Sequence, residues 1–263
     1  MDKQAIVSLL QPTLKTFFKI GKSSDTYDEF KDVFSSKIGG VPYWPKGKEY
    51  PTLNGKTAKL IFQLNIEEAI KDGIQFDKAI PDFPQKGIIQ FFFAFDDDMW
   101  GYPETEESTL VVYHEDISVE HFLPENIIYI NTTHDDMPFD KSVKVNFKQH
   151  EELLGTQDLY NHAVLKASNQ GFNLDDEDLY YEVEEANNAG SKVGGYAYFT
   201  QTDPLYYVGK KDVPNDLVLL LQLDSEDELH MMWGDCGVAN WRISLSKLKE
   251  RDFSKVYFNW DCC

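Results

Sequence analysis

The chain has 263 residues, of which 42% are hydrophobic and 14% aromatic, so it can bury a substantial core. Its 45 acidic and 25 basic residues give a formal net charge of -20. This excess of negative charge argues against binding to nucleic acid or to an anionic membrane surface, because both need an excess of basic groups. The sequence also contains no apolar run of the length that a membrane-spanning helix needs.

The first predicted element is an amphipathic helix over Met1–Ile20 that docks on the core. Its apolar residues recur at helical spacing, at Ile6, Leu9, Leu10, Leu14, Phe17 and Phe18. Charged residues are scattered through the same segment and no small-residue cleavage site follows, so we do not expect a signal peptide.

The next elements occur twice in the same order. The segment Ser36–Pro45, with the sequence SKIGGVPYWP, is echoed by SKVGGYAYFT at Ser191–Thr200. Downstream, LIFQLN at Leu60–Asn65 is matched by LLLQLD at Leu219–Asp224. A weaker third match relates residues 87–91 to residues 237–241. This order predicts an internal duplication, with one copy at about 36–100 and the other at about 191–250 of a single domain over 1–263.

Each copy has the same predicted local structure. The two adjacent glycines favour a positive φ or a close approach of the backbone. The strand that follows is apolar on both faces except for one glutamine, Gln63 or Gln222, which is typical of a strand covered on both sides. A glutamine buried there is either satisfied by the backbone of the facing loop or points into a pocket.

Between the copies the pattern changes. Residues 104–162 alternate weakly, as in Thr109–Tyr113 and Ile127–Ile130, which is typical of antiparallel strands. Residues 174–190 are rich in acidic side chains and predict a surface helix or an excursion. We therefore expect an α+β fold, internally duplicated, with mainly antiparallel sheets and flanking helices in one compact globule.

Several of these motifs together resemble a known family. They are Ser36–Gly40, Leu60–Leu64, Gly87–Phe92, Ser191–Gln201, Leu219–Ser225, Met232–Asp235 and Asp252–Cys262. In this order they are similar to the YwqG family, a bacterial family of unknown function that also occurs in other lineages. The resemblance implies an α+β fold built by duplication and a cytoplasmic location, and it implies no activity.

Motifs for nucleotides and metals are incomplete. Gly21–Ser23 and Gly55–Thr57 have the ending of a phosphate-binding loop but lack its first glycine. His150 opens a zincin-like motif whose second histidine is missing. The acidic runs Asp96–Asp98 and Asp224–Glu228 do not match the calcium-binding loop, although a hard cation remains an alternative to solvated strand ends. We expect neither a metal centre nor a cofactor.

The three cysteines are an odd number and predict no disulfide framework, which favours a reducing cytoplasm. Cys236 lies between glycines like an exposed nucleophile, but a catalytic cysteine needs a histidine partner, and His230 is the nearest in sequence. Cys262 and Cys263 at the end of the chain could react with oxidants or with a second chain; the alternative is that Cys262 packs beside Trp260 and Cys263 is frayed.

Polar and aromatic residues lodged among apolar ones are the candidate ligand-binding residues. They are Lys37, Gln63, Lys192, Gln222, Trp233, Asp235, Asn240, Trp260 and Asp261. If the two copies face each other across a pseudo-two-fold axis, both lysine–glutamine pairs converge on one cleft between them. The alternative is that Asp235 and Asp261 cap turns or form structural ion pairs with the two lysines.

Two functional hypotheses follow from the sequence. The first is a non-catalytic binding or interaction module with an acidic surface, whose partner is a basic protein or peptide, or a small ligand in a cleft between the copies. The second is a hydrolase-type enzyme that uses Asp235, Asp261 or Cys236. No catalytic residue can be assigned from a motif.

Overall fold

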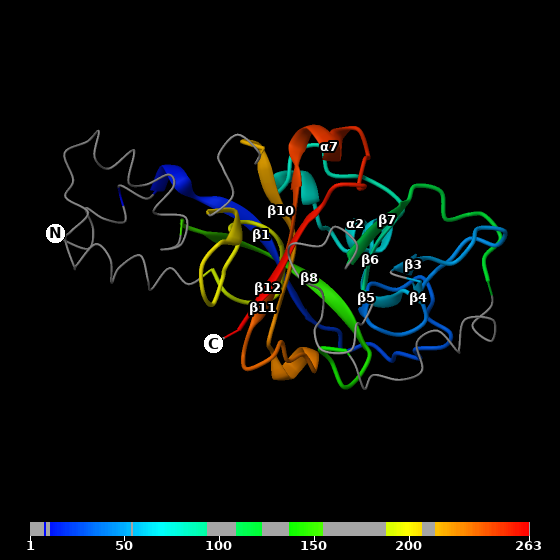
Figure 1. Ribbon diagram of the computed structural model, residues 1–263. Helices are drawn as coiled ribbons and strands as arrows, with labels where there is room; N and C mark the ends of the chain where they lie inside the picture. Colours follow the sequence, from blue (N-terminus) through cyan, green and yellow to red (C-terminus); the bar gives the residue numbers. More distant parts are fainter. Residues whose placement is uncertain are drawn as a thin grey trace.

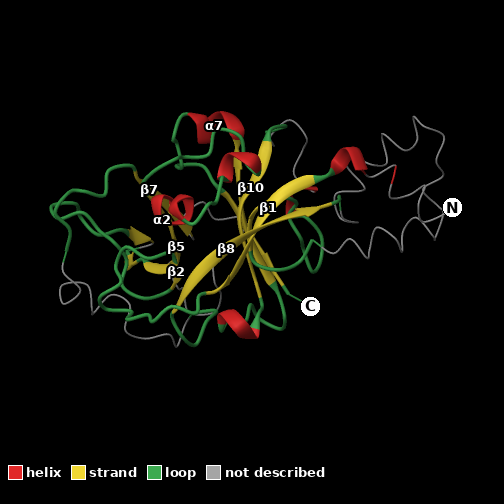
Figure 2. Ribbon diagram, turned by 180° about the vertical axis from the view of Figure 1, so that it is seen from behind, coloured by secondary structure: helices red, strands yellow, loops and turns green. Residues whose placement is uncertain are grey.

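The computed structural model describes residues 8, 11–53, 55–93, 109–122, 137–154, 188–206 and 214–262. Within them the protein is mostly β, with one ten-stranded antiparallel sheet and a separate two-stranded sheet. Its α-helices there are short, α2 (Ile66–Lys71) and α7 (Leu245–Lys249). The expected α+β fold with flanking helices is therefore wrong: most apolar segments form strands, as Figure 2 shows.

The large sheet has the strand order β12-β11-β10-β9-β1-β8-β2-β5-β6-β7. Its strands are β1 (Lys15–Lys22), β2 (Lys37–Ile38), β5 (Lys59–Asn65), β6 (Ile88–Phe93), β7 (Thr109–His114), β8 (Val143–Glu152), β9 (Lys192–Gly194), β10 (Leu217–Asp224), β11 (Val238–Ser244) and β12 (Tyr257–Asp261). The small sheet is the hairpin of β3 (Thr52–Leu53) and β4 (Lys56–Thr57). Short 3-10 helices lie in the connections, η1 (Gln11–Thr13), η2 (Phe76–Lys78), η4 (Pro204–Tyr206) and η5 (Asp227–Leu229).

The N-terminal helix that we expected up to Ile20 is wrong over its last six residues, which form β1. Phe18 and Ile20 are buried, whereas Lys15 and Lys19 are exposed. This two-residue alternation, in a segment rich in aromatic and β-branched residues, competes with the helical spacing that we used. Pairing with two neighbouring strands decides in favour of the strand. The predicted strand at Thr109–Tyr113 is confirmed as β7, whereas Ile127–Ile130 and residues 174–187 lie outside the described residues.

Two long strands, β1 and β8, join two groups of four strands each. We call β2, β5, β6 and β7 half A, and β9, β10, β11 and β12 half B. β1 pairs with β8 over eight residues, from Lys15 opposite Glu152 to Lys22 opposite Val145. β1 also pairs with β9, and β8 pairs with β2. Each half therefore takes as its neighbour a strand that lies far from it in sequence, and β1 and β8 cross the middle of the molecule (Figure 1).

The sheet curls until its two ends face each other across the main core. The Trp241 indole on β11 donates to Thr109 Oγ1 on β7 at 3.0 Å. Phe93 on β6 lies 4.9 Å from Phe258 on β12, measured between ring centroids. These contacts join the last strands of half A to those of half B, so the sheet forms a nearly closed, barrel-like layer around aromatic side chains.

The outer face of half A is covered as well. Val33, Val41 and Trp44, from the segments on either side of β2, pack against Leu60 and Phe92 in a second core. As a result β5 is buried on both faces, as its nearly continuous apolar sequence predicts. Neither of the α-helices in the described part of the chain has the length and apolarity to cross a membrane.

Both glycine pairs adopt the left-handed conformation. The φ angles are 61° and 74° for Gly39 and Gly40, and 78° and 79° for Gly194 and Gly195. A side chain on Gly195 would overlap the carboxylate of Glu152, which accepts a hydrogen bond from the Tyr196 amide at 2.6 Å. Glycine is required here by both the backbone conformation and the close approach.

We expect Gly195→Ala to lower the free energy of unfolding by about 2 kcal/mol or more, since it combines a left-handed alanine with displacement of a buried carboxylate. Gly55→Ala is the matched control, because Gly55 has a φ of 73° and no atom within 4 Å of an added Cβ. It should cost only the conformational part, about 1 kcal/mol. Equal losses in urea denaturation would contradict this account of Gly195.

Candidate functional site

The predicted lysine–glutamine pair of half A lies under a covering loop. Lys37 is opposite Gln63, and Gln63 is opposite Gln90, so the three form a row across β2, β5 and β6. The Gln63 amide donates to Val33 O and Ser35 O at 2.8 and 2.9 Å, and its oxygen accepts from the Tyr43 amide at 3.0 Å. Gln63 thus fastens the loop to the sheet.

His114 on β7 forms a hydrogen bond with the last residue of this row, Gln90. Its Nε2 lies 2.9 Å from Gln90 Oε1, and burial lowers the pKa of His114 from 6.5 to about 4. The ring is therefore neutral near pH 7, and since Gln90 Oε1 only accepts, Nε2 carries the proton. The Gln90 nitrogen donates to Tyr43 O and to Gln63 Oε1 at 2.6 and 2.8 Å, so both ends of this amide are satisfied.

Half B repeats much of this pattern. Lys192 is opposite Gln222, and Gln222 is opposite Asn240. The Gln222 amide donates to Asn188 O and Gly190 O, both at 2.9 Å, and its oxygen accepts from the Tyr198 amide at 2.8 Å.

The structure does not bring the two lysine–glutamine pairs together. They lie in different halves, with β8 and β1 between them, and each is buried beneath its own loop. Lys37, Gln63, Lys192 and Gln222 are all 0% exposed. Of the two roles that the sequence allows for the glutamines, the structure shows hydrogen bonding to the facing loop.

The two buried lysines have different partners. Lys37 Nζ donates to Asp32 O and Val41 O at 2.8 and 2.6 Å, and no carboxylate in the described part of the chain lies within ion-pair distance of it. Burial lowers the pKa of Lys37 from 10.5 to about 7. A neutral amine has two N–H groups, which matches the two carbonyl acceptors.

Lys192 instead forms a buried ion pair. Its Nζ donates to both carboxylate oxygens of Glu152, at 2.9 and 2.8 Å, and to Asn188 O at 2.6 Å. Burial lowers the pKa of Lys192, while the charge of Glu152 opposes this effect. The ion pair thus joins β9 to β8, a strand that is not its direct neighbour in the sheet.

The remaining predicted residues lie at the C-terminal end of half B. Asp261 Oδ1 and Oδ2 accept from the Thr200 and Gln201 amides at 3.2 and 2.9 Å, and burial raises the pKa of this carboxyl. The predicted role of Asp261 in capping a loop therefore agrees with the structure. Trp233 is fully buried, and its ring centroid lies 6.2 Å from that of Trp260.

Asp235 and Cys236 are exposed on the turn that precedes β11. Cys236 has a φ of 60°, and neither it nor Cys262 forms a disulfide. Among the described residues no histidine forms a hydrogen bond to Cys236. The residues proposed for hydrolysis are therefore separated into a capping acid and an exposed turn.

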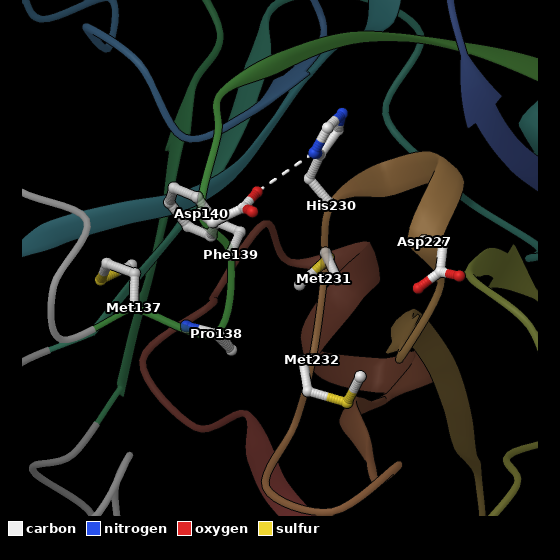
Figure 3. Close-up of a pocket in the computed structure, with 8 residues that line it drawn as sticks. All are labelled: Met137, Pro138, Phe139, Asp140, Asp227, His230, Met231 and Met232. Carbon is white, nitrogen blue, oxygen red and sulfur yellow. Dashed lines mark hydrogen bonds and ion pairs between the residues drawn. The ribbon is translucent and has the colours of Figure 1, made fainter.

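A hollow of about 490 Å³ lies elsewhere, between two segments far apart in sequence (Figure 3). Residues 137–140, before β8, and residues 230–232, after η5, run antiparallel, with the Met232 amide donating to Pro138 O at 2.8 Å. Its lining combines apolar and polar side chains: Met137, Pro138, Phe139, Asp140, Asp227, His230, Met231 and Met232.

His230, which lines the hollow, has two charged neighbours. His230 Nδ1 lies 3.1 Å from Asp140 Oδ1, and His230 Nε2 lies 3.4 Å from the ammonium group of Lys22 at the end of β1. Since an ammonium group only donates, this contact requires a lone pair on Nε2 and a proton on Nδ1. His230 itself adopts a left-handed φ of 57°, which turns the chain back toward residues 137–140.

The sequence matches a known protein family. A model described as a domain of unknown function, DUF1963, matches residues 36–262. The chain belongs to this family. Among curated proteins, none matches the chain. Membership of the DUF1963 family therefore supports the view of an uncharacterised protein and leaves its activity to be inferred from the site.

Sequence reasoning missed most of the hollow in this DUF1963 member. Met232 belonged to a motif and His230 was considered only beside Cys236, whereas Met137 and Asp140 carried no signal. Their role depends on the pairing of two distant segments, which no local pattern predicts. In the described part of the chain, no three His, Cys, Asp or Glu side chains are grouped as metal ligands.

The two lysines should respond differently to the same substitution. Lys192→Met leaves the carboxylate of Glu152, whose side chain is 10% exposed, without its counter-ion, so we expect a loss of about 3 kcal/mol or more in unfolding free energy. Lys37→Met, the matched control, leaves only two carbonyl groups without a donor and should lower the free energy of unfolding by about 1–2 kcal/mol. A larger loss for Lys37→Met in chemical denaturation would refute the assignment.

The stability of the protein should also depend on the protonation of Lys37. Because its pKa is about 7 in the folded protein and 10.5 in the unfolded chain, the unfolded chain binds more protons between these pH values. Stability relative to Lys37→Met should therefore rise with pH from about 7 to 10, by about 1 kcal/mol per unit. A difference that stays constant over this range would show that Lys37 remains charged.

Proposed function

We propose that this protein is a non-catalytic binding module whose hollow receives a peptide segment with a large apolar side chain next to a basic one. The observation that carries the proposal is the hollow of about 490 Å³ with methionines in its lining and carboxylates beside them. Its size falls within the range of ligand-binding pockets.

The apolar part of the ligand would contact the methionines. Met232 is 46% exposed, which is unusual for a large apolar side chain, whereas Met231 and Phe139 beneath it are 2% and 4% exposed. Methionine side chains are flexible and polarisable, so a surface of this kind adapts to different apolar groups. An exposed methionine over a buried apolar base favours contact with an apolar side chain of the partner.

The basic part of the ligand is inferred from charge. Asp140, whose side chain is 83% exposed, and Asp227 both line the hollow. The chain as a whole carries a formal charge of -20, which attracts basic partners and accelerates their association at low salt. Lys22 Nζ contacts His230 Nε2, and Figure 3 shows Asp140 and Asp227 to either side of His230.

Binding is favoured over the hydrolase alternative because the proposed catalytic groups have other roles or no partner. The carboxylate of Asp261 is occupied by two backbone amides. Cys236 is exposed and forms no hydrogen bond to a histidine in the described part of the chain. A nucleophile of this kind needs a base within hydrogen-bond reach.

We also propose that the chain is a single, internally duplicated domain of the YwqG type that resides in the cytoplasm. The duplication is supported by hydrogen bonds that recur at equivalent places: the backbone amide of Asn65 donates to Ser36 Oγ, and the backbone amide of Asp224 donates to Ser191 Oγ, both at 3.0 Å. The free thiols of Cys236 and Cys262 are consistent with a reducing compartment. Cell fractionation tests the location.

The binding proposal is tested with a pool of fluorescein-labelled heptapeptides that carry a central Leu, Ile, Phe or Met between lysine and arginine residues. Fluorescence anisotropy should show binding that weakens with added salt. Met232→Lys should weaken binding at least about tenfold, because it removes the apolar contact and adds a like charge, and tenfold corresponds to about 1.4 kcal/mol.

Val119→Lys is the matched control. Val119 is 42% exposed, lies outside the hollow and undergoes the same change of charge. It should reduce binding by less than about twofold, through the long-range charge alone. If the two variants bind equally, or if a pool with glutamate in place of lysine and arginine binds as well as the basic pool, the proposal is wrong.

A further inference from the structure

The polar rows of the two halves differ at one equivalent place, on β6 and β11. Gln90 of half A and Asn240 of half B occupy the same register place, each opposite the glutamine of its own half. Gln90 donates to Tyr43 O, and Asn240 Nδ2 donates to Tyr198 O at 2.7 Å. The loop contact is therefore kept, although the side chain in half B is shorter by one methylene.

The oxygen end of this amide has different surroundings in the two halves. Gln90 Oε1 accepts from His114, whereas Asn240 Oδ1 is buried without a hydrogen-bond partner. The place of His114, opposite Ile88, is taken in half B by Asp261, opposite Val238. An ionised carboxylate has no proton to donate, so it cannot replace the histidine. The orientation of the Asn240 amide is fixed, because Tyr198 O can only accept.

The neighbouring strand supplies a complementary group. Val112 is opposite Gln90 in half A, but Asn259 is opposite Asn240 in half B. Asn259 is 5% exposed, and its Nδ2 is buried without a partner. A buried acceptor and a buried donor therefore stand at directly opposed positions of β11 and β12, on the same face of the sheet.

One more unpartnered group is close in the fold. Arg242 lies two residues beyond Asn240 on the same face and is 8% exposed; its terminal nitrogens pair with Asp203 at 2.6 and 2.7 Å, while Nε has no partner. Each such group is costly unless something completes its hydrogen bonds.

We propose that this part of half B is a binding site for a primary carboxamide group, such as a side-chain or terminal amide. Its N–H would donate to Asn240 Oδ1, and its oxygen would accept from Asn259 Nδ2. An anion is disfavoured because Asp261 and Asp203 flank the site and Arg242 is already paired. This site is separate from the hollow, and the proposal does not depend on the binding of basic peptides.

Half A defines what a closed version of the site looks like. Asn240→Gln restores the longer amide of Gln90, and Asn259→Val restores the side chain of Val112. Each substitution introduces the side chain that half A carries at the same register place, so we expect both variants to remain folded. The covering loop is held by Asp261 and by the Arg242–Asp203 pair. The proposal therefore requires this loop to open for a ligand to enter.

The test follows the side-chain amide resonances of the ¹⁵N-labelled protein during titration with acetamide, with the Asn259 signal assigned by its loss in Asn259→Val. We expect the Asn240 and Asn259 signals to shift and to saturate at about millimolar concentrations, as is reasonable for so small a ligand. Asn240→Gln should abolish the saturable shift of the Asn259 signal. Asn259→Val should likewise abolish the saturable shift of Asn240.

Two control ligands and one control variant test whether the response depends on the hydrogen bonds of this site. N,N-dimethylacetamide, which accepts but cannot donate, and acetate should each give at least about tenfold weaker binding, since a missing donor leaves Asn240 unpaired. Gln90→Asn, which makes the same shortening in half A, should leave the acetamide response of half B unchanged. The proposal is overturned if the shifts do not saturate, if dimethylacetamide acts equally, if Asn240→Gln still responds, or if nothing shifts and water alone bridges the two amides.

Discussion

The pairing of β1 with β8 is the constraint on which the rest of this fold depends. These strands are neighbours over eight residues, and each one also provides the edge on which a short strand of one half is built, β9 on β1 and β2 on β8. The short strands have only two or three residues and cannot organise a sheet alone. The central pair therefore fixes the position of both polar rows.

Buried polar side chains then determine how the outer face of each half is covered. A glutamine on β5 or β10 satisfies backbone groups of a loop that would otherwise be left unpaired beneath the surface. The same arrangement places a buried lysine beside each glutamine. The two halves compensate differently for the burial of this lysine. Half A surrounds Lys37 with carbonyl groups and lowers its pKa, whereas Lys192 of half B pairs with Glu152 on the central strand β8.

The two proposed binding regions have different origins. The hollow forms where residues 137–140 run beside residues 230–232. The carboxamide site forms where half B has Asn240, Asn259 and Asp261 in place of Gln90, Val112 and His114. At the carboxamide site, the residues that half A and half B share maintain the fold, and those that differ provide candidate ligand contacts.

The sequence by itself determined the repeated motifs, the glycines that require a positive φ, the burial of β5 and β10, and the need for partners at Gln63 and Gln222. These features depend on contacts within a few residues or on a local period, so a linear pattern contains them. The strand at Lys15–Lys22, the place of each polar row and the hollow were decided only by the tertiary structure. A strand gains most of its stability from neighbours that are distant in sequence, and the same is true of a pocket between residues 139 and 231.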